Sequence, residues 1–171
     1  MDGVNHVLHS RVRAINSPYS VQGVTPGAGL AQTMDLDVRE GSLDRLGTGT
    51  IAVRENLGLK VGDTMSFAMA DGTDVTQKVV AVYGRGLGFG DLTLPYDLVA
   101  AHSDSPMGTV LVSAPDVSKD ALTKAVPAGV SVLTQAEAAG RPSGSTINYL
   151  ALGLIAAFAG IAMVNTLAMA V

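Results

Sequence analysis

The chain has 171 residues, with 15 Asp and Glu against 11 Lys and Arg and a formal net charge of −4. This acidic balance, with an aromatic content of 4% and no Trp, argues against a surface for nucleic acid, whose phosphates bind basic patches. The absence of cysteine excludes disulfides, thiolate metal sites and a cysteine nucleophile.

The length fits one soluble domain followed by one membrane span. The stretch from Met1 to Arg11 has no basic region followed by an apolar one, so it does not read as a secretory signal. An extracytoplasmic domain that begins here would be delivered by a segment upstream of Met1. We therefore expect the sequence to be a piece of a longer membrane protein.

The first predicted elements are short and of mixed type. Met34 to Val38 alternates apolar and polar residues, which predicts a half-buried strand. A short turn of helix is expected from Ser42 to Leu46, ended by a glycine. Thr50 to Val53 is predicted to be a strand, and Glu55 to Leu59 a second helical turn.

A β-hairpin is the best-defined unit of the sequence. Its strands, Thr64 to Ala70 and Thr73 to Tyr83, flank the pair Asp71-Gly72, which tolerates positive φ and suits a two-residue hairpin turn. A glycine-rich loop, Gly84 to Gly90, follows it. Asp91 to Leu94 is the next predicted strand.

A helix and a β-α-β unit are predicted further along. Pro95 fits the first position of a helix over Tyr96 to Ala101, because its missing N–H is unpaired there in any case. The β-α-β unit consists of a strand from Thr109 to Ser113, a helix capped by Ser118 that runs through Val126, and a strand from Val130 to Leu133.

The C-terminal part is predicted to leave this domain and enter a membrane. Thr134 to Glu137 has the spacing of a capping box and begins a brief helix, which a hinge from Gly140 to Ser145 ends. No charged side chain lies between Pro142 and Val171, and Tyr149 to Val171 is almost continuously apolar. A helix of roughly 20 apolar residues crosses a bilayer core. The alternative is a buried, Ala-rich core helix.

These patterns predict an α+β fold in two parts. Residues 1–142 form a small β-rich domain with the hairpin and the β-α-β unit, and residues 143–171 form one C-terminal transmembrane helix. Small residues at a spacing of four on this helix allow a second helix to approach closely, and a polar residue at membrane depth favours protein contacts. The predicted helix-packing residues are Gly153, Ala156, Ala157, Gly160 and Asn165. The alternative is an Ala-rich helix that happens to include two glycines.

The glycine loop invites comparison with a phosphate-binding loop. Gly84, Gly86, Gly88 and Gly90 lack the Gly-Lys-Ser/Thr ending of a P-loop, and the spacing departs from the dinucleotide fingerprint. A strand follows the loop in place of a helix N-terminus. We expect a flexible inter-strand loop, with no ATP binding or hydrolysis by this chain.

No catalytic, cofactor-binding or metal-binding residue is predicted. His6 and His9 have a spacing that suits a metal only on a helix, and nothing around them predicts a helix. His102 stands at the end of a predicted helix, where a solvated or capping role is ordinary. The sequence has no G-x-S-x-G elbow and no H-E-x-x-H motif.

Several motifs together resemble the FtsX-like permease family of ABC transporters, in particular its actinobacterial members. The motifs are Gly58-Leu-Lys-Val-Gly-Asp-Thr64, Asp71-Gly-Thr73, Val79-Val-Ala-Val-Tyr83 through Asp91, and the apolar stretch that contains Asn165-Thr-Leu167. The resemblance covers Leu36 to Val171. It implies that residues 1–142 are an extracytoplasmic domain related to the MacB periplasmic domain, and that 143–171 begin the second membrane helix.

The resemblance also implies partners. They are an ABC ATPase subunit that binds the ATP, together with other permease helices or a second permease copy in the cell membrane. The chain would then be a fragment of a permease subunit that couples the ATPase to the extracytoplasmic domain for export or mechanotransmission. The sequence leaves two alternatives: a tail-anchored extracytoplasmic binding or adaptor domain, and a membrane-tethered enzyme, which the missing catalytic residues disfavour.

Overall fold

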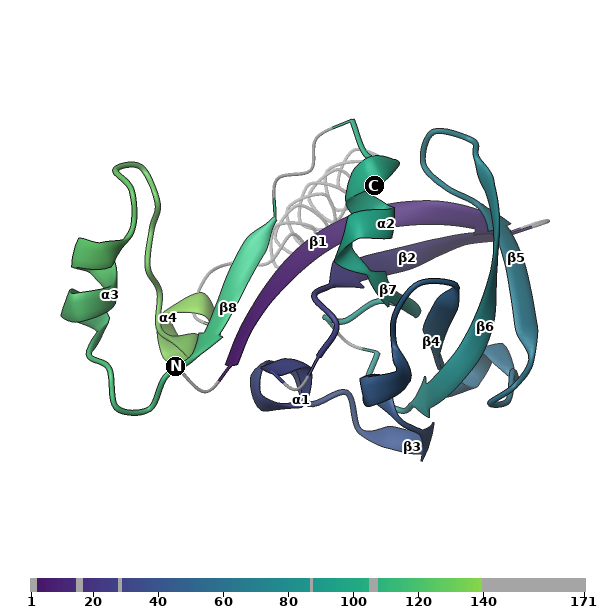
Figure 1. Ribbon diagram of the computed structural model, residues 1–171, viewed down its shortest axis with the longest axis horizontal. Coiled ribbons are helices and arrows are strands. Elements are labelled where there is room, and N and C mark those ends of the chain that lie inside the picture. The colour runs from purple at the N-terminus through teal and green to yellow at the C-terminus, as the bar shows by residue number, and fades with distance from the viewer. Residues whose placement is uncertain (1–2, 15–16, 28, 87, 105–107, 140–171) are drawn as a thin grey trace, which may run out of the picture. The chain divides into compact units, whose positions relative to one another are not determined.

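The computed structural model describes residues 3–14, 17–27, 29–86, 88–104 and 108–139 (Figure 1). The chain divides into two compact units, Met1–Val117 and Ser118–Val171. The first is rich in β-strands with short helices between them, which confirms the predicted α+β class. Among the described residues, no helix has the length and apolar character needed to cross a membrane. The predicted membrane helix over 143–171 lies outside the described residues.

Eight strands of the first unit form one sheet, in the order β2-β7-β4-β6-β5-β1-β8, with β3 paired to β6. β1 also pairs with β2, so the six strands from β2 to β1 in this order close into a ring. The pairs β2–β7 and β4–β6 are parallel, and the closing pair β5–β1 is a single antiparallel contact, Arg13 with Ala68. The strands are β1 Gly3–Ala14, β2 Ser17–Val24, β3 Val38–Gly41, β4 Thr50–Arg54, β5 Thr64–Ala68, β6 Asp74–Tyr83, β7 Leu92–Pro95 and β8 Thr109–Ser113.

The long strand β1 belongs to two parts of the sheet. Its residues from Val7 to Ala14 pair with β2, and those from Gly3 to Val7 pair with β8. The sequence analysis missed β1 and β2 because their polar and apolar residues do not alternate over the whole length. Consecutive residues Val7 and Leu8 are both buried, since both faces of this sheet are covered.

The core consists of two hydrophobic clusters that share the strands between them. Successive side chains of a strand point to opposite faces. Thus Ile51 and Val53 of β4 belong to one cluster, and Ala52 between them belongs to the other. The first cluster also takes Val99 from helix α2, Tyr96–Ala101, and the second takes Leu30 from helix α1, Gly29–Thr33.

A bulge in β6 explains why its residues from Val79 to Tyr83 are buried without a simple alternation. β4 pairs Ile51 with Val79 but Ala52 with Ala81, so Val80 is an extra residue on β6. The Val80 carbonyl accepts a hydrogen bond from Ser42 N at 3.2 Å. Gly41, with φ 78°, lies so close to this carbonyl that a Cβ would collide with it.

The predicted hairpin is confirmed, with a correction to its turn. Ala68 pairs with Asp74, and Met69 N donates to Thr73 O at 2.8 Å, which leaves a three-residue loop in place of the expected two. Gly72 N donates to Met69 O at 3.0 Å, and Gly72 has φ 88°. This is a type I turn followed by a left-handed glycine. Asp71 is not among the residues with positive φ.

The strand expected over Met34 to Val38 is wrong. Residues 34–37 have no regular structure, and β3 begins only at Val38. Asp37 has φ 57°, which interrupts an extended strand. Met34 and Leu36 are nevertheless buried in the second cluster. The alternation of apolar residues therefore indicated buried side chains correctly, although the segment is not a hydrogen-bonded strand.

The other short elements of the first unit follow the sequence closely. The two helical turns are 3₁₀ turns, η1 Leu43–Arg45 and η2 Glu55–Leu57, and Ser42 caps the first by accepting from Asp44 N. The strand expected over Thr50–Val53 extends to Arg54 as β4, and β8 has its predicted bounds. Pro95 ends β7 and precedes the first residue of α2.

The second unit contains two helices, α3 Lys119–Ala125 and α4 Gln135–Ala139. Ser118 caps α3 by accepting from Ala121 N, as predicted. The expected strand Val130–Leu133 is wrong, because these residues have no regular structure and pair with no strand among the described residues. Val130 is 54% exposed and Leu133 is 38% exposed, so nothing buries the apolar run that suggested a strand. The predicted β-α-β unit is therefore wrong.

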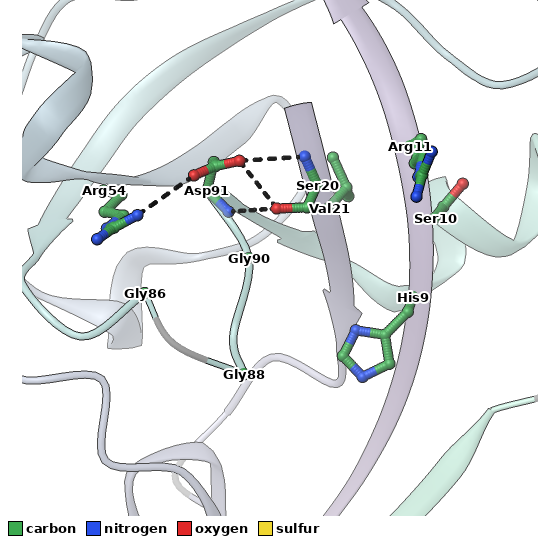
Figure 2. A pocket seen from close by; sticks show the side chains of 10 residues that line it. All are labelled: His9, Ser10, Arg11, Ser20, Val21, Arg54, Gly86, Gly88, Gly90 and Asp91. Atoms are coloured by element: carbon green, nitrogen blue, oxygen red, sulfur yellow. Dashed lines mark hydrogen bonds and ion pairs between the residues drawn. The ribbon is translucent and has the colours of Figure 1, made fainter. Parts of the chain in front are cut away.

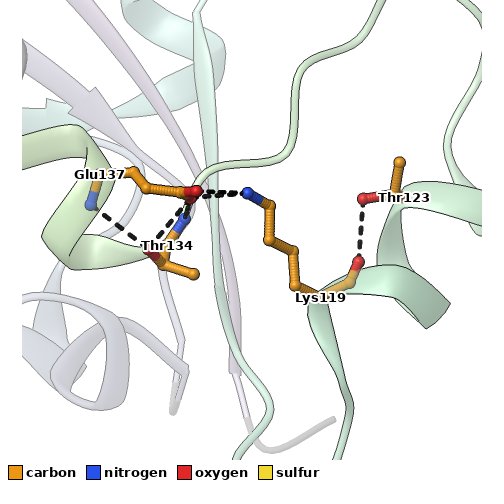
Figure 3. A network of polar contacts seen from close by, with 4 residues as sticks. All are labelled: Lys119, Thr123, Thr134 and Glu137. Carbon is orange, nitrogen blue, oxygen red and sulfur yellow. Dashed lines mark hydrogen bonds and ion pairs between the residues drawn. The ribbon is translucent and has the colours of Figure 1, made fainter.

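The capping box of α4 is confirmed. Thr134 N donates to Glu137 Oε2 at 2.8 Å, and Glu137 N donates to Thr134 Oγ1 at 3.3 Å. Lys119 donates to both carboxylate oxygens of the same Glu137, at 2.6 and 2.7 Å, which ties the first turn of α3 to α4 (Figure 3). The Lys119 hydrogen bond, followed by those from Thr134, lowers the pKa of Glu137 to about 2.

Candidate functional site

An open hollow of about 470 Å³ in the first unit gathers cationic and hydroxyl side chains from three strands and the glycine loop. Figure 2 shows Arg54 on one side of it, beside Asp91, and His9 across from Arg54 on strand β1. We call it the arginine hollow. Its lining residues are His9, Ser10, Arg11, Ser20, Val21, Arg54, Gly86, Gly88, Gly90 and Asp91.

Asp91 fixes the centre of the arginine hollow by binding Ser20 of β2. Its Oδ2 accepts from Ser20 N at 3.2 Å and from Ser20 Oγ at 2.8 Å. Asp91 N donates in turn to Ser20 O at 2.9 Å and lies 3.1 Å from Ser20 Oγ. The carboxylate is thereby held at the start of β7, and its oxygen Oδ1 faces Arg54 (Figure 2).

Arg54 ends β4 and has most of its side-chain donors unused within the described part of the chain. Its Nη1 lies 3.7 Å from Asp91 Oδ1, which is an ion pair too long for a hydrogen bond. Its Nε is buried and has no hydrogen-bond partner among the described residues. The absence of a side chain at Gly86 makes room for this guanidinium, because a Cβ there would collide with Arg54 Nε.

The glycine loop uses its amide groups to hold its own shape. Gly84 N and Arg85 N donate to the carbonyls of Asp37 and Leu36, at 3.0 and 3.1 Å. Phe89 N and Gly90 N both donate to Gly86 O. A phosphate-binding loop needs such amides directed at the ligand. The loop connects β6 to β7, as predicted, and its expected flexibility stays a prediction.

A row of buried polar side chains, linked by hydrogen bonds, lies beneath the arginine hollow. Gln22 Nε2 donates to Thr93 Oγ1 at 2.8 Å, Thr93 Oγ1 lies 3.3 Å from Tyr83 Oη, and Tyr83 Oη donates to Gly90 O at 3.2 Å. Burial raises the pKa of Tyr83 above its ordinary value. This row links β2, β7 and β6 to the end of the glycine loop, so it fixes where Gly90 and Asp91 lie.

The three histidines do not come together. His6 and His9 both lie on β1, where a spacing of three places side chains on opposite faces. His6 Nδ1 lies 3.1 Å from Thr25 Oγ1. Among the described residues there is no group of three His, Cys, Asp or Glu side chains placed to hold a metal ion.

His102 has a specific partner that the sequence did not indicate. Its Nδ1 lies 2.8 Å from Oδ2 of Asp71, at the tip of the β5–β6 hairpin. This hydrogen bond, followed by one from Thr73 N, lowers the pKa of Asp71 to about 2. The sequence suggested a solvated or capping role for His102; in the structure it is the C-cap of α2 and also contacts the hairpin.

The predicted helix-packing residues Gly153, Ala156, Ala157, Gly160 and Asn165 lie outside the described residues, and their roles remain predictions. The arginine hollow was missed by the sequence analysis. Arg11 and Arg54 are far apart in the chain and carry no local motif, so only the pairing of β1, β2, β7 and β4 brings them to one hollow.

No family model matches the chain, and no curated protein sequence matches it. The fold is similar to a domain of a permease candidate from Porphyromonas gingivalis, with 16% identity and a TM-score of 0.47 over 71% of this chain and 64% of that one. It is also similar to the extracellular domain of the noncanonic ABC-type transporter YknZ from Gram-positive bacteria, with 14% identity and a TM-score of 0.48 over 71% and 68% of the two chains. The chain spans less than two thirds of the first of these structures.

Proposed function

We propose that this chain is part of the permease subunit of an ABC transporter of the FtsX-like kind. Residues 1–142 form its extracytoplasmic domain, related to the MacB periplasmic domain, and residues 143–171 form a helix in the cell membrane. The domain has no catalytic role. A separate ATPase subunit binds and hydrolyses ATP, and the helices transmit its cycle to the outer domain for export or mechanotransmission.

The observation that carries the proposal is the uncharged run from Pro142 to Val171, which follows the β-rich unit and the helices α3 and α4 in the chain. A stretch of this length and apolar character has a membrane as its natural environment. The motifs from Gly58 to Asp91 that resemble the permease family support the same assignment, because they occur in order along one domain.

The route of the chain through the first unit also supports an inserted domain. Gly3 at the start of β1 pairs with Ser113 at the end of β8. The first residue of the sheet and its last residue therefore lie side by side, at one end of the antiparallel pair β1–β8. A domain inserted between two membrane helices needs this arrangement, since both connections return to the same surface.

The test is whether the apolar run assembles with other helices and couples to an ATPase. We would restore the chain to its native gene context, purify the complex with its ATPase, and compare Gly160→Leu with Leu154→Ile. Leucine at 160 would force closely packed backbones apart. We expect Gly160→Leu to reduce assembly or coupled ATP turnover, and Leu154→Ile, at a position that we assign to lipid, to leave both unchanged.

The circular dichroism of both variants serves as the folding control, because the outer domain is expected to be unaffected. Unchanged assembly and turnover in Gly160→Leu would contradict the proposal. The run would then be a simple anchor, and the tail-anchored binding or adaptor domain would be the better interpretation. Failure to find any ATPase in the purified complex would lead to the same conclusion.

A further inference from the structure

We propose that the arginine hollow binds a small oxyanion of the phosphate type, either a free anion or the headgroup of an anionic lipid. The proposal rests on the described side chains of the first unit. It does not depend on the permease assignment, because a tail-anchored adaptor could carry the same site.

The first support is the charge of the lining. Two arginines, Arg11 and Arg54, and one carboxylate, Asp91, line the hollow, in a chain whose total charge is −4. The third basic side chain is His9. Within the described part of the chain, the side chains of His9 and Arg11 make no hydrogen bond or ion pair with another residue. The hollow is thus a local concentration of positive charge on an acidic protein.

The second support is the state of the Arg54 guanidinium. This group has five N–H donors in a planar fork that matches an oxyanion. Its Nε is buried without a partner among the described residues, and its nearest carboxylate oxygen is 3.7 Å away. The Arg54 side chain is 37% exposed, and its Nη groups make no hydrogen bond among the described residues, so these are the donors that an anion in the hollow would contact.

The third support is that the Asp91 carboxylate already has partners for both of its oxygens. Its Oδ2 accepts two hydrogen bonds from Ser20, and its Oδ1 faces Arg54. The carboxylate therefore positions Arg54 by an ion pair with Nη1 (Figure 2). A ligand with two or three acceptor oxygens could contact Arg54 on one side and Arg11 on the other.

A phosphate titration tests the proposal with the full chain in nanodiscs of zwitterionic lipid. The readout is the Nε–H resonance of Arg54 in arginine-labelled protein, recorded at fixed ionic strength as inorganic phosphate is added. We expect a saturable shift of this resonance. Arg11→Gln should weaken the apparent affinity roughly tenfold, because it removes one charge-assisted contact.

Arg13→Gln is the matched control. It removes the same charge from the same strand two residues away, and Arg13 lines a different hollow. It should leave the phosphate affinity unchanged. Arg54→Gln, followed through the backbone amides of Ser20 and Asp91, should abolish the saturable shift. If Arg13→Gln weakened binding as much as Arg11→Gln, the effect would be unspecific charge and the site would be refuted.

A second arm separates the two sources of the anion. Nanodiscs that contain phosphatidic acid replace the zwitterionic ones, without added phosphate. A shift of the Arg54 resonance there but not with inorganic phosphate assigns the site to lipid headgroups, and the reverse assigns it to a soluble anion. Absence of a shift in both arms would overturn the proposal.

Discussion

The two units of this chain are stabilised in different ways. The sheet of residues 3–117 surrounds two clusters of buried hydrophobic side chains that come from strands far apart in the sequence. From 118 to 138 no residue is buried, and the helices α3 and α4 are defined by polar contacts close in sequence. Short helices are marginal without tertiary packing. The comparison shows that the first unit is stabilised by hydrophobic contacts between residues far apart in the sequence, whereas the second is stabilised by helix caps between residues close in sequence.

The largest effect on the free energy of unfolding is expected when a leucine of the first unit is replaced by alanine, and we compare it with the same replacement in the second unit. Leu92 of β7 is fully buried in the first cluster, and Leu122 of α3 is half-buried. We expect Leu92→Ala to lower the free energy of unfolding by about 2–5 kcal/mol, because it leaves a cavity. Leu122→Ala should cost less than about 1 kcal/mol. Chemical denaturation of the detergent-solubilised chain measures both, and equal costs would remove the distinction between the units.

Two glycines in the first unit allow the stability cost of a left-handed backbone conformation to be measured apart from the cost of a steric collision. Gly41 and Gly49 have nearly the same φ, 78° and 77°, but only Gly41 has a neighbour that a Cβ would meet. We expect Gly49→Ala to cost about 1 kcal/mol for the left-handed conformation alone. Gly41→Ala should cost more, because the Val80 carbonyl must move. Thermal unfolding of both variants checks the order, and a reversal would contradict the bulge geometry at Val80.

A smaller, local effect is expected from the capping box. Thr134→Ala removes the hydroxyl that accepts from Glu137 N, and the loss of an N-cap costs about 1 kcal/mol of helix stability. Hydrogen exchange should accelerate in α4 and stay unchanged in the sheet. Ser118→Ala is the corresponding change in α3. Faster exchange in β4 or β6 would show that the second unit supports the first, and the two units would then not be stabilised independently.

The smallest expected effect is the weakening of two carboxylate contacts at low pH. The pKa values of Asp71 and Glu137 are both lowered to about 2, by the partners His102 and Lys119 respectively. A carboxyl with a depressed pKa in the folded state stabilises above its unfolded value, and this contribution is lost as the pH falls through the folded value. We therefore expect each contact to weaken between about pH 4 and pH 2. Carboxyl NMR titration of each region measures it, with Asp71→Asn and Glu137→Gln as controls that remove the local response.

Local signals in the sequence predicted local structure well. The cap at Ser118, the capping box at Thr134, the hairpin around Gly72 and the strand β8 all depend on residues close together in the chain. The failures all required knowledge of a distant partner. β1 and β2 were missed because distant segments pack on both faces of these strands, which removes the simple alternation. Val130 to Leu133 was predicted to be a strand, although it pairs with no strand in the described part of the chain.

The candidate site was beyond sequence reasoning for the same reason. Arg54 and Arg11 carry no motif, and the feature that distinguishes Arg54, a buried Nε without a partner in the described structure, exists only after folding. The sequence separated the glycine loop from P-loops by its missing Lys and Ser/Thr, and the absence of ATP binding stays a prediction. The sequence could not show why residue 86 is a glycine, because the Arg54 guanidinium that needs this space comes close only in the folded chain.

The central claim is that the β-rich domain lies outside the cell and that Tyr149 to Val171 lies in the membrane. Residues 1–171 contain no cysteine, so an introduced cysteine is the one thiol of this segment that can be labelled. In intact cells that carry the chain in its native gene context, a membrane-impermeant maleimide should label Asp97→Cys, at an exposed position on α2, and should not label Ala157→Cys. Labelling of Asp97→Cys only after lysis, or of Ala157→Cys in intact cells, would contradict this topology.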